Sequence, residues 1–193
     1  MGLERLRSEP VLIGPAFVGK TAIGARLAER LGLPFVDLDE VGNDYYRAAG
    51  MALADFTAQI QTHGYSKAHR WWQPARVAGV QGVLSDHRGS VIALGAGHTH
   101  YEDHAYFEIV QAALAPFDNV VLLLPAADVD RSVEILRRRS LASGGPAWSH
   151  EGHDWLREWC ESAQNVALAT QTVYTADRSA DETADRVARL VGR

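Results

Sequence analysis

Short apolar runs separated by amphipathic segments predict a layered fold of strands and helices. The runs, the last of them brief, cover residues 11–13, 91–94, 120–124, 172–175 and 34–36. They do not alternate between apolar and polar residues, which is typical of strands buried on both faces of a parallel sheet. Between them, apolar residues recur at helical spacing, as at Ile23, Leu27 and Leu31. This order of elements predicts an α/β fold.

Two regions depart from this rhythm of strand and helix. Residues 41–88 read as helical and contain no apolar run of the strand type, so we expect a subdomain there that covers one sheet edge. Residues 140–154 contain Gly-Gly-Pro and little periodicity, which favours a mobile loop. No linker and no internal repeat divides the chain. We therefore expect one domain over residues 1–193.

Charge and cysteine content argue against several classes of protein. The 193 residues carry a formal net charge of −5 and no basic stripe, so no nucleic-acid partner is expected. Cys160 is the one cysteine, which leaves no internal disulfide and favours a reducing compartment. No membrane span is expected, because no run of apolar residues is long enough, and no signal peptide is recognised. These features predict a cytoplasmic protein.

The segment GPAFVGKT, residues 14–21, matches the phosphate-binding pattern G-x-x-x-x-G-K-[ST]. Glycines let such a loop curl so that its N–H groups point at phosphate oxygens, and the following helix presents its positive end. A strand precedes the loop and an amphipathic helix follows it, as the motif requires. The alternatives are a chance match in a glycine-rich turn and a loop that no longer binds nucleotide. The predicted ATP-binding residues are Gly14, Pro15, Ala16, Phe17, Val18, Gly19, Lys20 and Thr21, with Thr21 also binding Mg²⁺.

Other proteins with such a loop need features that this chain lacks. A GTPase should offer an N/T-K-x-D-type segment that reads guanine, and none is found. The large oligomeric ATPases need a longer chain and a strand that ends in an acidic pair, whereas here the corresponding run ends in Leu124-Pro125. The compact chain therefore favours a small-molecule or nucleotide kinase.

Several segments together resemble the shikimate kinase family. They are LAERLGLPFVDLDE, AAGMALADF, VIALGAGHT, RRRSL and ADETADRVARLV. The resemblance implies a three-layer α/β P-loop NTPase fold of the nucleoside/shikimate kinase type, with a five-stranded parallel sheet. It also implies a helical substrate-binding subdomain at about residues 41–88 and a lid at about residues 139–154.

The resemblance assigns roles to an Asp-x-Asp pair that follows the second strand. Asp37 would help Thr21 to hold Mg²⁺, and Asp39 would orient the substrate hydroxyl and draw off its proton. Alternate residues of an extended segment face the same way, so both carboxylates can point into one cleft. The alternative is that the pair forms a helix N-cap with an acidic first turn.

Two further segments carry roles that the resemblance implies. The glycine loop Gly95, Ala96, Gly97 would bring backbone N–H groups against the substrate, although it could also be a simple turn. Arg139 would be a catalytic lid arginine that closes over the ATP phosphates. The alternative for Arg139 is a solvated helix C-terminus, a position that favours cations in any case.

The sequence departs from the family where the substrate carboxylate should be held. Arg70 can serve as the first arginine only with a shift of about one residue, and Arg76 is a weaker candidate. The second arginine is missing from the stretch CESAQNVALAT, and Arg157 comes too early. Since a bidentate arginine discriminates strongly for carboxylates, its loss favours a substrate other than shikimate, which nevertheless stays possible. The space is filled instead by residues that could bind a ring or simply pack in the core: Trp71, Trp72, Trp148, Trp155, Trp159 and Asn165.

A polar cluster follows the glycine loop and contains His98, His100 and His104 with two acidic residues. It could bind zinc or form a surface loop, and His98 or His100 could hydrogen-bond the substrate. We therefore predict an ATP- and Mg²⁺-dependent kinase, monomeric or a weak homodimer, that phosphorylates a small-molecule alcohol such as a cyclitol, sugar, nucleoside or antibiotic-like alcohol. The alternatives are a catalytically weak regulatory nucleotide-binding protein and, more remotely, a metal-dependent hydrolase.

Overall fold

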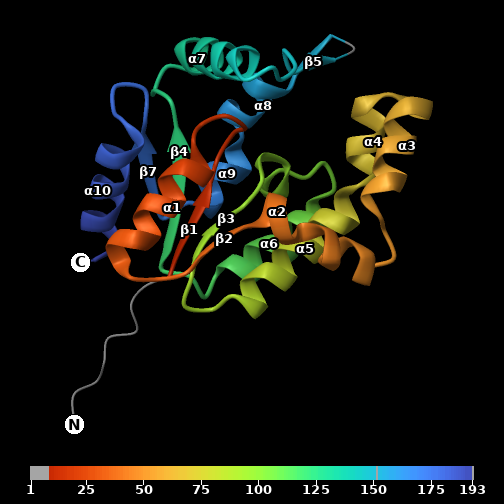
Figure 1. Ribbon diagram of the computed structural model, residues 1–193. Coiled ribbons are helices and arrows are strands. Elements are labelled where there is room, and N and C mark those ends of the chain that lie inside the picture. The colour runs from red at the N-terminus through yellow and green to blue at the C-terminus, as the bar shows by residue number, and fades with distance from the viewer. Residues whose placement is uncertain (1–8, 151, 193) are drawn as a thin grey trace.

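The computed structural model describes residues 9–150 and 152–192, and within them five strands form one parallel sheet (Figure 1). The strand order is β2-β3-β1-β4-β7. The strands are β1 (Pro10–Ile13), β2 (Phe35–Asp37), β3 (Val91–Ala93), β4 (Asn119–Leu124) and β7 (Gln171–Tyr174). Each predicted apolar run coincides with one of these strands, and the bounds of run and strand agree within about one residue at either end.

Helices cover both faces of the sheet. One face packs against α1 (Lys20–Leu31), α7 (Val129–Ala142), α8 (Trp155–Glu161) and α10 (Ala180–Val191). The other packs against α2 (Leu38–Ala48), α5 (Gln73–Asp86), α6 (His104–Leu114) and α9 (Ala163–Leu168). Along β1, Leu12 faces the first layer while Val11 and Ile13 face the second, which explains why the strand is apolar at every position. The predicted three-layer α/β fold with a five-stranded parallel sheet is confirmed.

Helix ends follow local signals in the sequence. Helix α1 ends at Gly32, whose φ of 64° is left-handed and whose N–H closes the last turn on Ala28 and Glu29. Helix α10 begins with a capping box between Ser179 and Glu182. Helices α1 and α10 then pack against each other along their length.

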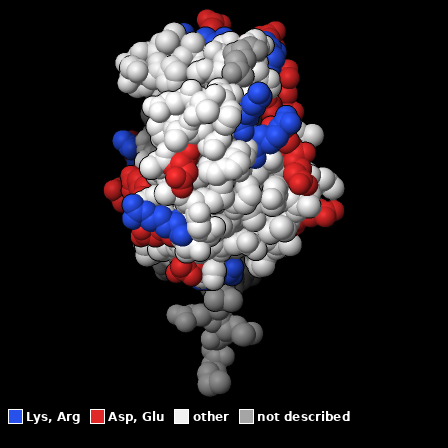
Figure 2. Space-filling view, turned by 90° about the vertical axis from the view of Figure 1, so that its right-hand side faces the viewer, with Lys and Arg blue, Asp and Glu red and all other residues white. Residues whose placement is uncertain are grey.

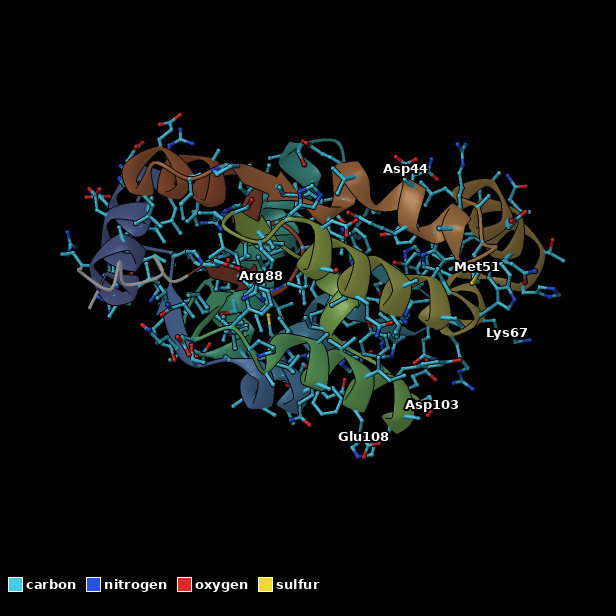
Figure 3. The ribbon with its side chains drawn as sticks, turned by 90° about the horizontal axis from the view of Figure 1, so that it is seen from below. Asp44, Met51, Lys67, Arg88, Asp103 and Glu108 are labelled. Carbon is cyan, nitrogen blue, oxygen red and sulfur yellow. The ribbon has the colours of Figure 1, made fainter. Side chains whose placement is uncertain are left out.

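The region at residues 41–88 is helical and without a strand in the structure. It comprises most of α2, then α3 (Leu53–His63), α4 (Tyr65–Trp71) and α5. Helices α3 and α4 pair and project from one end of the sheet (Figure 1), and α3 buries none of its residues. Seen from below, α2, α5 and α6 lie side by side (Figure 3). A substrate-binding role for this region stays a prediction.

The region at residues 140–154 has more regular structure than we expected. Helix α7 continues to Ala142, and a two-stranded antiparallel pair, β5 (Ser149–His150) and β6 (His153–Asp154), follows the Gly-Gly-Pro turn. The short strands escape periodicity analysis because two residues cannot show a pattern.

No helix within the described ranges is long and apolar enough to cross a membrane. On the face shown in Figure 2, basic and acidic side chains are interspersed rather than gathered by sign.

Candidate functional site

The loop between β1 and α1 has the backbone shape that its sequence predicts. Gly14 and Gly19 have positive φ angles of 134° and 105°, and a Cβ atom on Gly14 would lie 2.3 Å from the Leu123 carbonyl oxygen. Phe17 also lies in the left-handed region, with a φ of 62°. Lys20, the first residue of α1, curls its ammonium back to donate to the carbonyls of Gly14 and Pro15, each at 2.9 Å. The loop therefore encloses its own lysine.

Burial of Lys20 perturbs its acid–base behaviour. The side chain is almost fully buried, and this burial lowers its pKa to about 8. The carboxylates of Asp39 and Asp37 oppose the shift, because they favour the charged ammonium. The two aspartates and the lysine thus share one electrostatic environment, as a phosphate-transfer site requires.

The Asp-x-Asp pair takes a different shape from the one expected. Asp37 ends β2 and accepts a hydrogen bond from the Thr21 hydroxyl at 2.6 Å. Its other oxygen accepts from the Asp39 N–H at 3.0 Å, so Asp37 is the N-cap of α2. Asp39 consequently lies in the first helical turn, and the prediction that the pair shares an extended segment is wrong. Both residues nevertheless line one cavity, so capping and a place in the site coexist.

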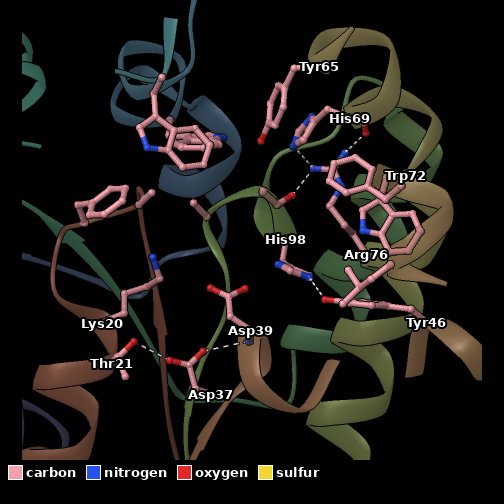
Figure 4. Close-up of a pocket in the computed structure, with 18 of the residues that line it drawn as sticks. Lys20, Thr21, Asp37, Asp39, Tyr46, Tyr65, His69, Trp72, Arg76 and His98 are labelled. Atoms are coloured by element: carbon pink, nitrogen blue, oxygen red, sulfur yellow. Dashed lines mark hydrogen bonds between the residues drawn. The ribbon is translucent and has the colours of Figure 1, made fainter. Parts of the chain in front are cut away.

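This cavity has a volume of about 620 Å³ and joins the phosphate-binding loop to the helical region (Figure 4). One side is formed by loop and helix residues Ala16, Phe17, Gly19, Lys20 and Thr21, and the floor by the two aspartates. The far wall contains the glycine segment Ala96, Gly97 and His98 together with His69 and Arg76. Aromatic rings complete the wall: Tyr46, Phe56, Tyr65, Trp72, Trp148 and Trp159.

The glycine segment forms a wall of the cavity as well as a turn. Residues Ala96–Thr99 form a single 3₁₀ turn, η1. A Cβ atom on Gly95 would lie 2.2 Å from Asp39 Oδ1, and one on Gly97 would lie 2.8 Å from His69 Nε2. Gly95 has an ordinary φ of −63°, so the space beside it, and not its backbone conformation, requires glycine there. The two glycines thus allow the side chains of Asp39 and His69 to approach this segment closely.

The structure places Arg76, and not Arg70, in the cavity wall. The Arg70 side chain is 72% exposed and pairs with Glu102 on the outside of the molecule. Arg76 is buried on α5 and donates to the carbonyls of Gly97 and His100. The prediction for Arg70 is corrected on this point, since the outward face of α4 carries it away from the cavity.

His69 occupies the position that the one-residue shift had indicated. It is buried, lines the cavity and accepts a hydrogen bond from Arg76 through Nε2 at 3.1 Å. Burial, reinforced by the positive charge of Arg76, lowers its pKa to about 2. Sequence reasoning missed His69, although the misfit of Arg70 by one residue was the signal that could have found it.

A second arginine does not join the site. Arg157 is exposed and pairs with Asp130 and Glu161. Asn165, in the stretch where an arginine was wanted, is buried and bonds to the Thr99 hydroxyl at 2.6 Å. Among the described residues that line the cavity, Arg76 is the only arginine.

The three histidines of the predicted polar cluster lie in different surroundings. His98 is buried in the cavity wall, and burial together with Arg76 lowers its pKa to about 3. His100 pairs with Glu158, whereas His104 is exposed and pairs with Glu108. No three potential metal ligands come together in the part of the chain that the structure describes. The zinc alternative thus finds no support in the geometry.

The tryptophans divide between core and cavity. Trp155 and Trp159 are both buried, as core packing would require, but Trp159 also faces the cavity. Trp72 lines the cavity and packs edge-on against Tyr46 at 5.2 Å between ring centroids, while Trp71 beside it is partly exposed. The three cavity residues Tyr46, Phe56 and Tyr65 were not predicted, because scattered aromatic residues give no local signal.

Arg139 lies on the outer side of the phosphate-binding loop. Its Nη1 is 3.4 Å from the carbonyl oxygens of Phe17 and Val18, and it is half-buried rather than solvated. A second hollow of about 180 Å³ opens there, between Arg139 and the segment that contains Thr175 and Arg178. The loop thus separates two spaces, with the larger cavity on its inner side.

Comparison with known proteins agrees with this geometry. A family model described as shikimate kinase matches residues 17–191. The chain belongs to the shikimate kinase family. A shikimate kinase from Thermobifida fusca is 31% identical over 179 residues, which are 93% of this chain and 92% of that protein.

Solved structures of other proteins share the fold at lower identity. The structure of shikimate kinase from Acinetobacter baumannii in complex with shikimate has a TM-score of 0.64 and 17% identity, and covers 95% of this chain and 92% of that one. A gluconokinase from Sinorhizobium meliloti has a TM-score of 0.50 and 16% identity, with 98% and 94% covered. As a member of the shikimate kinase family, this protein is an ATP-dependent kinase with a hydroxyl group as acceptor.

Proposed function

We propose that this kinase phosphorylates a hydroxyl group of a small hydroxylated ring compound, such as a cyclitol, sugar, nucleoside or antibiotic-like alcohol, in preference to shikimate. The observation that carries the proposal is the set of hydrogen bonds that the Arg76 guanidinium makes within the protein. Its Nη1 donates to the carbonyls of Gly97 and His100 and to His69 Nε2, and its Nη2 donates to the carbonyl of His69. Nε has no partner among the described residues, so only the Nε–Nη2 edge of the guanidinium stays open to a carboxylate, whereas the fork between the two Nη atoms is taken by the protein itself.

The loop residues 14–21 would hold the phosphates of ATP through their N–H groups, with Lys20 released from its two carbonyls to follow the transferred phosphoryl group. The hollow beside Arg139 continues outward from this loop and would receive the rest of the nucleotide. Arg139 would thereby act on the ATP side of the site.

Thr21 and Asp37 fit a magnesium ion. Their oxygens lie 2.6 Å apart, and a hydroxyl with a carboxylate is the kind of donor set that Mg²⁺ accepts alongside water and phosphate. When bound, the ion would neutralise charge on the phosphates. The hydrogen bond between Thr21 and Asp37 holds the two groups together beforehand.

Asp39 would prepare the acceptor. Its carboxylate lines the cavity and belongs to an exposed residue, so a substrate hydroxyl can reach it. The carboxylate would accept a hydrogen bond from that hydroxyl, orient its oxygen toward the phosphoryl group and take its proton as the new O–P bond forms. The aromatic wall would bind the apolar face of the ring.

Shikimate is the second candidate acceptor. A buried cation, Arg76, lies in the cavity wall, and the relatives of 30–31% identity are named shikimate kinases. A cytoplasmic location and a monomeric or weakly dimeric state stay predictions.

A coupled ADP-release assay over shikimate, cyclitols, sugars and nucleosides tests the proposal. We expect a neutral ring alcohol to give the highest kcat/KM. Turnover with shikimate alone would show that the interpretation of Arg76 is wrong. Asp39→Asn serves as the control for the site, because it keeps the shape of the side chain and removes its basicity.

A further inference from the structure

Three side chains that line the cavity form a row where the acceptor hydroxyl would bind. They are Tyr46, His98 and Asp39. The Tyr46 hydroxyl and His98 Nε2 are hydrogen-bonded at 2.7 Å, and both residues are buried. On the other side of the imidazole, Nδ1 and Asp39 Oδ1 approach Gly95 so closely that a Cβ atom there would lie 2.5 Å and 2.2 Å from them. Figure 4 shows the His98 ring between the Asp39 carboxylate and the Tyr46 hydroxyl.

The direction of the bond between Tyr46 and His98 follows from their surroundings. Among the described residues, His98 is the only hydrogen-bond partner of the Tyr46 hydroxyl, so its proton has no other acceptor there. His98 Nδ1 is buried and has no hydrogen-bond partner in the described part of the chain. If Nε2 carried the proton, the hydroxyl proton would be unpaired. A bare Nδ1 lone pair would then lie beside the Gly95 backbone acceptor and near the Asp39 carboxylate, and both arrangements are unfavourable.

We propose that Tyr46 fixes the tautomer of His98, and that His98 thereby positions Asp39: the Tyr46 hydroxyl donates to Nε2, the imidazole proton resides on Nδ1, and this N–H points at Asp39 Oδ1. Burial keeps the imidazole neutral, since it lowers the pKa of His98 to about 3, and keeps the hydroxyl protonated, since it raises the pKa of Tyr46 above its ordinary value. The pair therefore holds one proton arrangement across the neutral pH range.

The consequence for the reaction concerns which oxygen of Asp39 is free. An N–H aimed at Oδ1 leaves Oδ2 for the acceptor hydroxyl. During transfer the acceptor oxygen forms its bond to phosphorus, the bond from phosphorus to ADP breaks, and the acceptor proton passes to Asp39. His98 is a positioning residue in this scheme, and the inference rests on the proposed role of Asp39.

The tautomer can be measured without any substrate. In ¹⁵N-labelled protein, long-range ¹H–¹⁵N spectra distinguish protonated from bare imidazole nitrogens, and His98→Gln assigns the signals. We expect Nδ1 of His98 to be protonated in the wild type and the proton to move to Nε2 or exchange in Tyr46→Phe. A proton on Nε2 in the wild type overturns the proposal.

Kinetic measurements on two His98 variants then distinguish a positioning role of His98 from a packing role. His98→Asn can place an amide donor near the position of Nδ1, whereas His98→Gln can reach Tyr46 but offers no donor toward Asp39. With ATP, MgCl₂ and shikimate, or the ring alcohol that replaces it in the acceptor screen, we expect His98→Asn to retain about tenfold more kcat than His98→Gln. The KM for ATP should be the same in both. Equal kcat values for the two variants contradict positioning.

A double-mutant cycle completes the test. Tyr46→Phe should lower kcat by about tenfold in the wild type but have little effect in the Asp39→Asn background, because the two residues act through one group. Tyr45→Phe is the matched control, being the same change one residue away and outside the cavity. If Asp39→Asn is fully active, the proposed function of Asp39 fails. If it is inactive while Tyr46→Phe behaves as Tyr45→Phe, only the present inference fails.

Discussion

The hydroxyl of Thr21 donates to Asp37 Oδ2 at 2.6 Å and joins the start of α1 to the end of β2. These residues are far apart in the sequence, yet the parallel sheet brings the carboxyl ends of β1 and β2 to the same edge. The contact links the phosphate-binding loop to the acidic floor of the cavity. Two oxygens are thereby arranged before any ligand arrives.

Asp37→Asn should therefore weaken the use of Mg²⁺. The amide keeps the N-cap of α2 but loses the negative charge, so we expect a half-saturating Mg²⁺ concentration raised by roughly 10- to 100-fold. Titration of ADP release with MgCl₂ measures this. Asp44→Asn on the outside of α2 is the control (Figure 3), and an unchanged titration for Asp37→Asn would remove this residue from the metal site.

Gly95→Ala should impair catalysis more than folding. The new methyl group would meet Asp39 Oδ1, the end of a side chain that can rotate away, and also the buried His98 ring, which has less room to move. A misplacement of the carboxylate by about 1 Å can lower a rate by about 100-fold. We expect that loss in kcat together with a lower Tm. A variant with wild-type kcat would show that the position of Asp39 is not critical.

Arg139→Ala should act on ATP alone. Arg139 borders the outer hollow and not the acceptor cavity, so we expect the KM for ATP to rise by about tenfold and the KM of the acceptor to stay constant. Arg138→Ala, an exposed neighbour on α7, provides the comparison. A rise in the KM of the acceptor would contradict the assignment of Arg139 to the ATP side of the loop.

Arg70 and Arg76 should differ sharply in their effect on stability. Arg70→Ala removes a mostly exposed ion pair and should change the free energy of unfolding by less than about 0.5 kcal/mol. Arg76→Ala leaves three carbonyls, one buried and two partly buried, without this donor and should cost about 3 kcal/mol. Urea denaturation of both variants decides the matter, and similar values for the two would contradict the structural role of Arg76.

Acid should destabilise the protein through its buried histidines. The pKa values of His69 and His98 are lowered to about 2 and about 3, so the folded state stays neutral at pH 5 while the unfolded chain takes up protons. Stability is then complete above the unfolded pKa of about 6.5 and falls as the pH drops below it, by about 2 kcal/mol per histidine at pH 5.

His98→Asn isolates one of these contributions. Between pH 7.5 and pH 5, this variant should lose about 2 kcal/mol less stability than the wild type, because one proton-binding site is absent from its unfolded chain. Urea denaturation at the two pH values measures the difference. Equal losses in the two proteins would mean that His98 is protonated in the folded state.

The sequence by itself determined the features that rest on neighbouring residues. The apolar runs predict all five strands of the sheet, because burial on both faces requires continuous apolar residues. The segment at residues 14–21 predicts its own loop, since glycines, Lys20 and Thr21 act within one turn. The roles expected of Asp37 and Asp39 came from the resemblance of the segment that contains them to the shikimate kinase family.

Only the tertiary structure decided which side chains form the acceptor wall. Whether Arg70 or Arg76 faces inward depends on the rotation of α4 and α5 about their axes, which is set by packing against the rest of the molecule. The bond between Tyr46 and His98 joins residues from α2 and the glycine segment, and no local pattern encodes it. Asp39 lies in a helix because Asp37 caps it. The sequence left this N-cap open as an alternative, and the hydrogen bond from the Asp39 N–H to Asp37 decides it.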